Sequence, residues 1–252
     1  GLFALSTAMI GFFLLLLRID VVEGAIATVS LFGQSLVRGR DVNTFVIQVH
    51  AAVATFLYSW GMALAVFASS GLIPSVLEPG RISLLLSKPV RRWQIVAGRY
   101  LGNLLVVSLN ICYLVAGVWL VFGWKTGVWR TQFLWTMATT IFIFAVLLTV
   151  VIWIGVVFES SALATMVTLA LMVISPILAQ TRIAEKLLSS EESRALWRGL
   201  YYVLPKIYDL ARMTLSIVRD RPVESLMPVW SSAIFAALML ASAIYMFSRR
   251  DF

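Results

Sequence analysis

Residues 133–158 read FLWTMATTIFIFAVLLTVVIWIGVVF, a run without a single charged side chain. About 20 apolar residues are enough for a helix to cross the hydrocarbon core of a bilayer. The whole chain has 252 residues, of which 61% are hydrophobic and only 13% are charged. A soluble domain is about half apolar and a quarter charged. The composition therefore argues against a soluble enzyme and indicates an integral membrane protein.

Five other apolar runs flank this one, so the sequence predicts an all-α membrane protein with six transmembrane helices in a single domain over residues 1–252. The first run is short for a span and the chain begins inside it, so we expect a native N-terminal piece to precede it. Between the first two runs, Gly33, Gly39 and Asn43 predict a loop with one weakly amphipathic helix. The predicted spans are about 1–17, 45–73, 95–123, 133–158, 162–179 and 227–247.

The charge balance is basic, with 20 Lys and Arg against 12 Asp and Glu and a net charge of +8. In a membrane protein, basic residues collect in cytoplasmic loops and meet anionic lipid, so we expect a lipid bilayer as partner and no nucleic acid. The single cysteine, Cys112, and the single histidine, His50, exclude an internal disulfide and a Cys/His zinc site. We expect no metal in this chain.

The polar segments between the spans predict the orientation of the chain. Basic residues are concentrated between the second and third spans, which places that loop and both termini in the cytoplasm. The long segment 180–225 predicts two amphipathic helices that meet near Pro205 and are too polar to span. We interpret them as an extracytoplasmic cap over a pathway exit, and an anchor on the lipid surface is the alternative.

The loop after the second span contains a distinct pattern of prolines, apolar residues and basic residues. Residues 78–102 read EPGRISLLLSKPVRRWQIVAGRYLG. Pro79 suits the first turn of a helix, and Pro89 ends it. The apolar residues between the two prolines can form one face. The sequence therefore predicts a short amphipathic helix in the plane of the membrane surface, followed by basic residues.

This pattern resembles the connection between spans two and three in the type-2 ABC transporter permeases, particularly the branch linked to copper-enzyme maturation and gliding motility. It departs at Arg81, where Thr is usual, and at Arg99, which replaces Lys. The run from Tyr201 to Pro205 extends the resemblance over most of the chain. The resemblance implies a cytoplasmic coupling helix that docks on a separate ATPase subunit, and a merely basic anchoring loop is the alternative. The candidate coupling residues are Glu78, Gly80, Arg81, Leu85, Leu86, Ser87, Lys88, Pro89, Arg91 and Arg92.

The energy source is predicted to lie outside this chain. A carrier driven by an ion gradient needs ionisable groups inside its spans, and the runs 45–73, 133–158 and 162–179 contain no acidic residue, lysine or arginine. The chain also lacks the Gly-rich phosphate cradle of a P-loop ATPase. We therefore expect no catalytic residues and no cofactor here, with ATP and magnesium held by the partner subunit.

Small polar residues repeat at helical spacing in two of the spans. The resemblance implies that spans two and five face a dimer axis and line a translocation path. Close helix packing through small hydroxyls is an equally open alternative, and for Asn103 and Asn110 we favour hydrogen bonding to another helix. The candidate lining residues are Gln48, Thr55 and Ser59, on a face with Met62, and Ser161, Thr165, Thr168 and Ser175.

Taken with the resemblance, the sequence predicts the permease subunit of an ATP-driven ABC transporter in the inner, cytoplasmic membrane. It would export a substrate or act on an extracytoplasmic client, as a homodimer with two copies of the ATPase and with room for a periplasmic partner. The alternative is a non-transporting membrane scaffold for a copper enzyme or a motility apparatus. The small polar residues along spans two and five do not indicate whether the substrate is a lipid, a glycan, a peptide, a drug or a sulfur species.

Overall fold

The computed structural model describes residues 2–15, 17–22, 25–31, 34–37, 40–77, 91–180 and 191–249. Within these residues, five helical segments are long and apolar enough to cross a membrane. The first predicted span is instead a shorter apolar helix, α1 (Leu2–Leu15), so six spans are not confirmed. The five segments are Val42–Ser69, Arg92–Thr126, Thr131–Phe158, Ser161–Leu178 and Met227–Ser248.

The second predicted span consists of three consecutive helical pieces. α2 (Val42–Phe56) passes into a π-helical turn, η1 (Leu57–Gly61), and then into α3 (Met62–Ser69). Asp41 caps the start of α2 because its carboxylate accepts a hydrogen bond from the Thr44 backbone N–H at 2.8 Å. This bond lowers the pKa of Asp41. A short helix, α4 (Pro74–Leu77), follows.

The remaining predicted spans are helices whose ends lie within a few residues of those expected. Ser160 caps α8 by accepting a hydrogen bond from the Leu163 N–H at 3.3 Å, and Pro228 occupies the first turn of α12. Two amphipathic helices, α10 and α11, lie in the long polar segment. The elements are α6 (Arg92–Thr126), the 3-10 turn η2 (Thr131–Leu134), α7 (Trp135–Phe158), α8 (Ser161–Leu178), α10 (Glu191–Val203), α11 (Ile207–Val218) and α12 (Met227–Ser248).

The segment before α2 is a small antiparallel sheet, so the predicted loop with a weakly amphipathic helix is wrong. Strand β2 (Ala25–Leu31) pairs with β1 (Leu17–Val22), β3 (Gln34–Val37) and β4 (Arg40–Asp41). The physical reason lies in the composition of these runs, which are rich in β-branched residues. Such short runs separated by glycines in the sequence favour hairpins over a helix.

By its internal contacts the chain divides into two compact units built from interleaved segments. The first comprises residues 1–60, 107–141 and 213–223, and the second comprises 61–106, 142–212 and 224–252. Helices α6, α7 and α11 contribute residues to both.

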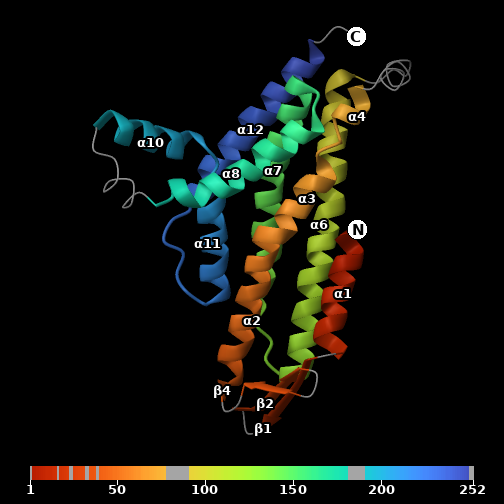
Figure 1. The fold of residues 1–252 in the computed structure, drawn as a ribbon, viewed down its shortest axis with the longest axis vertical. Coiled ribbons are helices and arrows are strands. Elements are labelled where there is room, and N and C mark those ends of the chain that lie inside the picture. The colour runs from red at the N-terminus through yellow and green to blue at the C-terminus, as the bar shows by residue number, and fades with distance from the viewer. Residues whose placement is uncertain are drawn as a thin grey trace. The chain divides into compact units, whose positions relative to one another are not determined.

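In the first unit, α1 lies alongside the second half of α6 (Figure 1). The Ser6 hydroxyl donates to Asn110 Oδ1 at 3.0 Å, and this bond is buried. At the other end of α1, Lys125 Nζ donates to the Leu14 carbonyl at 2.7 Å. The expectation that Asn110 bonds to another helix is thereby confirmed.

In the second unit, α6 is tied to α3 by a second amide. Asn103 Nδ2 donates to Ser69 Oγ at 2.6 Å, and the Ser69 hydroxyl in turn donates to the Ala65 carbonyl at 2.6 Å. This confirms the corresponding expectation for Asn103. Elsewhere in this unit Trp153 Nε1 donates to the Ser242 hydroxyl of α12 at 3.1 Å.

We predict that Asn103→Leu lowers the free energy of unfolding by about 1 kcal/mol, because hydrogen bonds between membrane helices contribute about 0.6–2 kcal/mol. Unfolding in detergent micelles, followed by circular dichroism, measures this loss. In a Ser69→Ala background the same substitution should cost much less, since the bond is already broken. An equal loss in both backgrounds would contradict a direct interaction.

Candidate functional site

The candidate coupling residues from Glu78 to Pro89 lie outside the described residues, and only Arg91 and Arg92 of the set are described. The Arg91 backbone N–H donates to Gln94 Oε1 at 2.9 Å, which fixes the start of α6. Its side chain is exposed. The Arg92 side chain is half-buried, and Nη1 donates to the Ser248 carbonyl at the end of α12 at 3.4 Å. The two arginines thus have different surroundings.

Of the four residues expected on one face of the second span, Met62 differs from the three candidate lining residues. Gln48 and Thr55 are exposed and Ser59 is half-buried, but Met62 is only 1% exposed. The cause is the π-helical turn η1 between Thr55 and Met62, because a π-turn contains an additional residue and interrupts the 3.6-residue period. Met62 therefore does not continue the face, which is a correction of the predicted stripe.

In α8, the candidate lining residues have a different environment. Ser161 is exposed, whereas Thr165, Thr168 and Ser175 are buried. The two threonine hydroxyls donate to carbonyls of their own helix, at 2.8 Å and 2.7 Å. Ser175 accepts a hydrogen bond from the Tyr208 backbone N–H of α11 at 2.9 Å. Within the second unit these residues pack against the chain's own helices.

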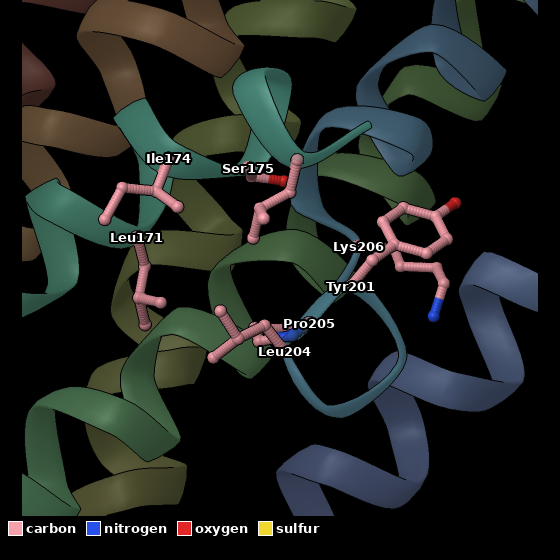
Figure 2. Close-up of a pocket in the computed structure, with 8 residues that line it drawn as sticks. Leu171, Ile174, Ser175, Tyr201, Leu204, Pro205 and Lys206 are labelled. Atoms are coloured by element: carbon pink, nitrogen blue, oxygen red, sulfur yellow. The ribbon is translucent and has the colours of Figure 1, made fainter. Parts of the chain in front are cut away.

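Near Ser175, a pocket opens between the last turns of α8 and the chain that leaves α10. It encloses about 270 Å³ of space between atoms, part of which is open to the surroundings. Figure 2 shows the apolar side chains on one side and the Lys206 ammonium group directed away from them. The lining residues are Leu171, Ile174, Ser175, Leu178, Tyr201, Leu204, Pro205 and Lys206.

Lys206 joins three helices of the second unit, although its side chain is charged. It is only 2% exposed, and its Nζ donates to Ser231 Oγ of α12 at 3.2 Å. The ammonium also lies 4.7 Å from the ring centre of Tyr201 and 5.4 Å from that of Tyr202. Burial lowers the pKa of Lys206, and the nearby Asp209 carboxylate opposes part of that shift.

The Lys206 backbone and the Tyr201 side chain also connect the helices that the Lys206 side chain joins. The Lys206 backbone N–H donates to Ser232 Oγ at 3.0 Å, and the Tyr201 hydroxyl donates to Asp209 Oδ2 at 2.7 Å. Burial and this hydrogen bond raise the pKa of Tyr201, so it remains a donor throughout the physiological pH range. The end of α10, the start of α11 and the start of α12 are therefore held together by polar contacts.

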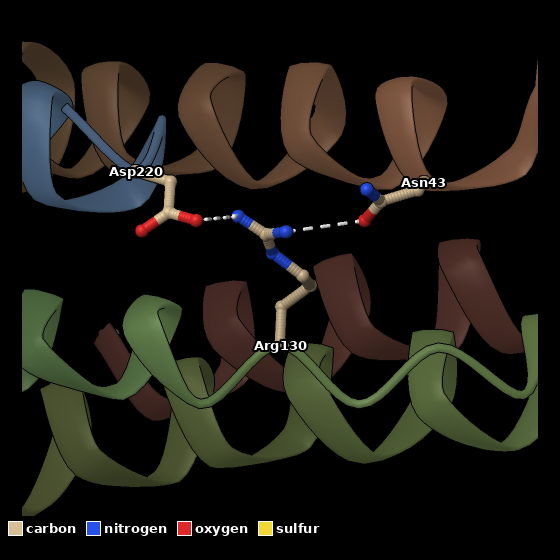
Figure 3. Close-up of polar contacts among 3 residues, drawn as sticks. All are labelled: Asn43, Arg130 and Asp220. Carbon is tan, nitrogen blue, oxygen red and sulfur yellow. Dashed lines mark hydrogen bonds and ion pairs between the residues drawn. The ribbon is translucent and has the colours of Figure 1, made fainter.

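A second polar cluster, in the first unit, is centred on Arg130 at the start of η2. Figure 3 shows its guanidinium between Asn43 and Asp220. Nη1 donates to Asn43 Oδ1 at 3.2 Å, and Nη2 lies 3.7 Å from Asp220 Oδ2. Close by in the chain, Phe133 stacks on the buried His50 ring with 4.0 Å between ring centres. One guanidinium thereby contacts the start of α2 and the residues that follow α11.

Comparison with protein families matches residues 42–252 to the ABC-2 family transporter proteins. The chain belongs to this family. Among curated protein sequences, no match is found. The ABC-2 assignment makes the chain a membrane permease component of an ABC transporter, and the family implies an ATPase partner subunit. With five helices in its described part that are long and apolar enough to cross a membrane, this permease is a multi-pass membrane protein.

The two polar clusters of this ABC-2 permease were not predicted from its sequence. The local sequence does not distinguish Lys206 or Arg130 from the other basic residues outside the spans. For Lys206 the position between Pro205 and the apolar Ile207 was a weak signal of burial. Arg130 and Asp220 lie far apart along the chain, so no local pattern connects them.

We predict that Tyr201→Phe destabilises the protein by about 1.5–3 kcal/mol, because hydrogen bonds to charged groups contribute about that much. The change removes the hydroxyl donated to Asp209 and keeps the ring beside Lys206. Thermal unfolding in detergent at neutral pH measures the effect. Tyr202→Phe is the matched control, because that side chain is 63% exposed. Equal effects of the two substitutions would contradict a stabilising hydrogen bond from Tyr201 to Asp209.

Proposed function

We propose that this permease exports a substrate, or acts on an extracytoplasmic client, as a homodimer that binds two copies of an ATPase subunit. In this proposal 1–252 works as one transmembrane permease domain, and ATP and magnesium are bound only by the partner. ATP binding closes the ATPase pair, and the resulting movement reaches the spans through the segment 78–89. The protein would act in the inner, cytoplasmic membrane.

The observation that supports ATP as the energy source is the lack of charge in the spans. Of the five described spans, only Arg92–Thr126 contains acidic residues, lysine or arginine. A carrier coupled to protons or sodium needs such groups near the middle of the membrane. His50 is the single histidine of the chain, and its buried Nε2 has no hydrogen-bond partner among the described residues. Energy supplied by a second subunit is consistent with this arrangement.

The different surroundings of Arg91 and Arg92 refine the proposed coupling site. Arg91 is exposed at the end of α6 that follows the segment 78–89, so its guanidinium is available to an acidic surface of the ATPase. Arg92 instead hydrogen-bonds to the end of α12. We therefore assign contact with the partner to Arg91, and to Arg92 the positioning of α6 against α12.

We predict that Arg91→Glu reduces co-purification of the ATPase subunit and the ATPase activity of the complex by roughly tenfold, since loss of about 1.4 kcal/mol lowers a binding constant tenfold. Its effect on the thermal stability of the isolated permease should be small. Pull-down from membranes, followed by ATP hydrolysis in detergent, measures both quantities. Arg221→Glu is the charge-matched control, because Arg221 is also exposed.

Unchanged assembly and activity in Arg91→Glu would contradict the proposed coupling contact. Recovery of the wild-type permease without any nucleotide-binding subunit would instead favour the non-transporting scaffold.

We further propose that α10 and α11 form an extracytoplasmic cap. Asp220, which follows α11, contacts Arg130, and Arg130 follows the end of α6 that is opposite to Arg92. If the segment 78–89 is cytoplasmic, the end of α11 is therefore on the other side of the membrane. Helix α10 buries none of its residues and exposes Leu196, as expected for a helix that contacts lipid or cargo.

We predict that Ala195→Cys, in a Cys112→Ser background, reacts with a membrane-impermeant maleimide added from outside the cell. Ala195 is exposed on α10, within the described residues. Arg91→Cys in the same background should react only after the membrane is opened. Mass spectrometry of the purified permease measures the modification. Labelling of Ala195→Cys from the cytoplasmic side alone would refute the cap and invert the topology.

A further inference from the structure

The Arg130 guanidinium has one side whose hydrogen-bonding capacity is unused. Nη1 is engaged with Asn43, but Nε and Nη2 are buried and have no hydrogen-bond partner among the described residues. The Asp220 carboxylate lies 3.7 Å from Nη2, beyond the 2.7–2.9 Å of a charge-assisted hydrogen bond. A buried donor without a partner costs about 1–3 kcal/mol. This side of Arg130 therefore requires an acceptor.

Nε and Nη2 are the two donors that lie next to each other along one edge of a guanidinium. Their parallel N–H groups match two oxygens of one carboxylate or phosphate, which is the strongest hydrogen-bonding arrangement that arginine makes. A water molecule offers only one oxygen. The unused edge of Arg130 is thus suited to an oxyanion.

Asp220 is a weakly held counter-ion for this edge. Its side chain is 65% exposed, and exposed ion pairs contribute little. Its backbone is in the left-handed region, with φ 59°, directly after the C-terminal end of α11. The helix dipole disfavours a negative charge at that end. Because this ion pair is long, exposed on the Asp220 side and placed at a helix C-terminus, it is weak, and an external anion can replace the carboxylate.

The surroundings of Arg130 are those of the lipid head-group region. Trp119 Nε1 donates to the Arg130 carbonyl at 3.1 Å, and the Trp119 ring lies 4.8 Å from that of Trp129. Trp124, at the end of α6, is 83% exposed. Tryptophans of this kind are enriched where membrane helices meet the head groups. Phosphate groups of lipids are therefore available at the level of Arg130.

We propose that Nε and Nη2 of Arg130 bind the phosphate oxygens of an anionic phospholipid head group, in exchange with the Asp220 carboxylate. Asn43 holds Nη1 in both states and keeps the edge oriented. When the lipid binds, Asp220 moves away from Arg130 and the residues after α11 lose this contact with η2. The site is a lipid-binding site and is independent of the transported substrate and of the ATPase.

Native mass spectrometry of the full chain, purified in detergent with phosphatidylglycerol or phosphatidylcholine, tests the proposal. We expect Arg130→Gln to reduce retained phosphatidylglycerol roughly tenfold, the loss of one bidentate contact. Arg130→Lys should restore only part of it, because an ammonium lacks the two-donor edge. Asp220→Asn should increase retention several-fold, since the competing carboxylate is gone. Arg221→Gln, an exposed neighbour with the same charge change, should have no effect.

Asp220→Asn keeps the test informative if Arg130→Gln fails to fold, because asparagine tolerates the left-handed conformation and carries no charge at the helix end. Unchanged retention in Asp220→Asn would overturn the exchange, as would equal losses in Arg130→Gln and Arg221→Gln. Inorganic phosphate, added to protein in phosphatidylcholine, distinguishes the source of the oxyanion. Binding of free phosphate that requires Arg130 identifies a soluble anion, and binding of phosphatidylglycerol alone identifies the lipid.

Discussion

A polar group inside the hydrocarbon core of a membrane is stabilised by a partner within the protein, and this constraint shapes the described spans, with His50 Nε2, Asn110 Nδ2 and Thr136 Oγ1 as buried exceptions. Helices satisfy their backbone groups internally. The hydroxyls of Thr55, Thr165 and Thr168 do the same by donating to carbonyls one turn earlier in their own helix. Such hydroxyls are no longer free donors for a passing substrate, so a stripe of them along a helix does not identify a transport pathway.

The same constraint gives unusual weight to the few polar contacts between helices. Lipid tails are as apolar as leucine side chains, so apolar burial alone does not determine which helix faces meet. The Asn110 amide pairs α6 with α1 through Ser6, and the Asn103 amide pairs α6 with α3 through Ser69. In each case one atom of the amide has one specific partner on another helix, whereas Asn110 Nδ2 has no hydrogen-bond partner among the described residues. These bonds therefore select particular neighbours within the two units, and apolar contacts then complete the packing.

The sequence predicts the helices, because these depend on composition and on the spacing of apolar residues. It does not predict the sheet, the π-turn or the contacts between residues that lie far apart along the chain. Among the described residues, the five long apolar helices follow from long apolar runs with few or no charges, and the amphipathic helices α10 and α11 follow from their period. The sheet does not follow from the sequence pattern because its strands are short and the glycines between them in the sequence are also typical of loops. The burial of Met62 does not follow from the helical period, because the π-turn η1 has no signature in the sequence. The Arg130 cluster joins residues that no local pattern connects.

The largely buried side chains of Lys206 and Arg130 have different surroundings, because lysine and arginine need different hydrogen-bond partners. The Lys206 ammonium is compact and can rotate, so a serine hydroxyl and the faces of two tyrosine rings contact it, with the Asp209 carboxylate nearby. It can serve as a permanent junction between helices. The guanidinium of Arg130 is planar and rigid, and Asn43 can satisfy only one end of it. Its other edge needs two oxygens in one plane, which Asp220 at 3.7 Å does not supply. The Lys206 ammonium therefore has its partners within the chain, whereas the buried Nε and Nη2 edge of Arg130 has no hydrogen-bond partner among the described residues.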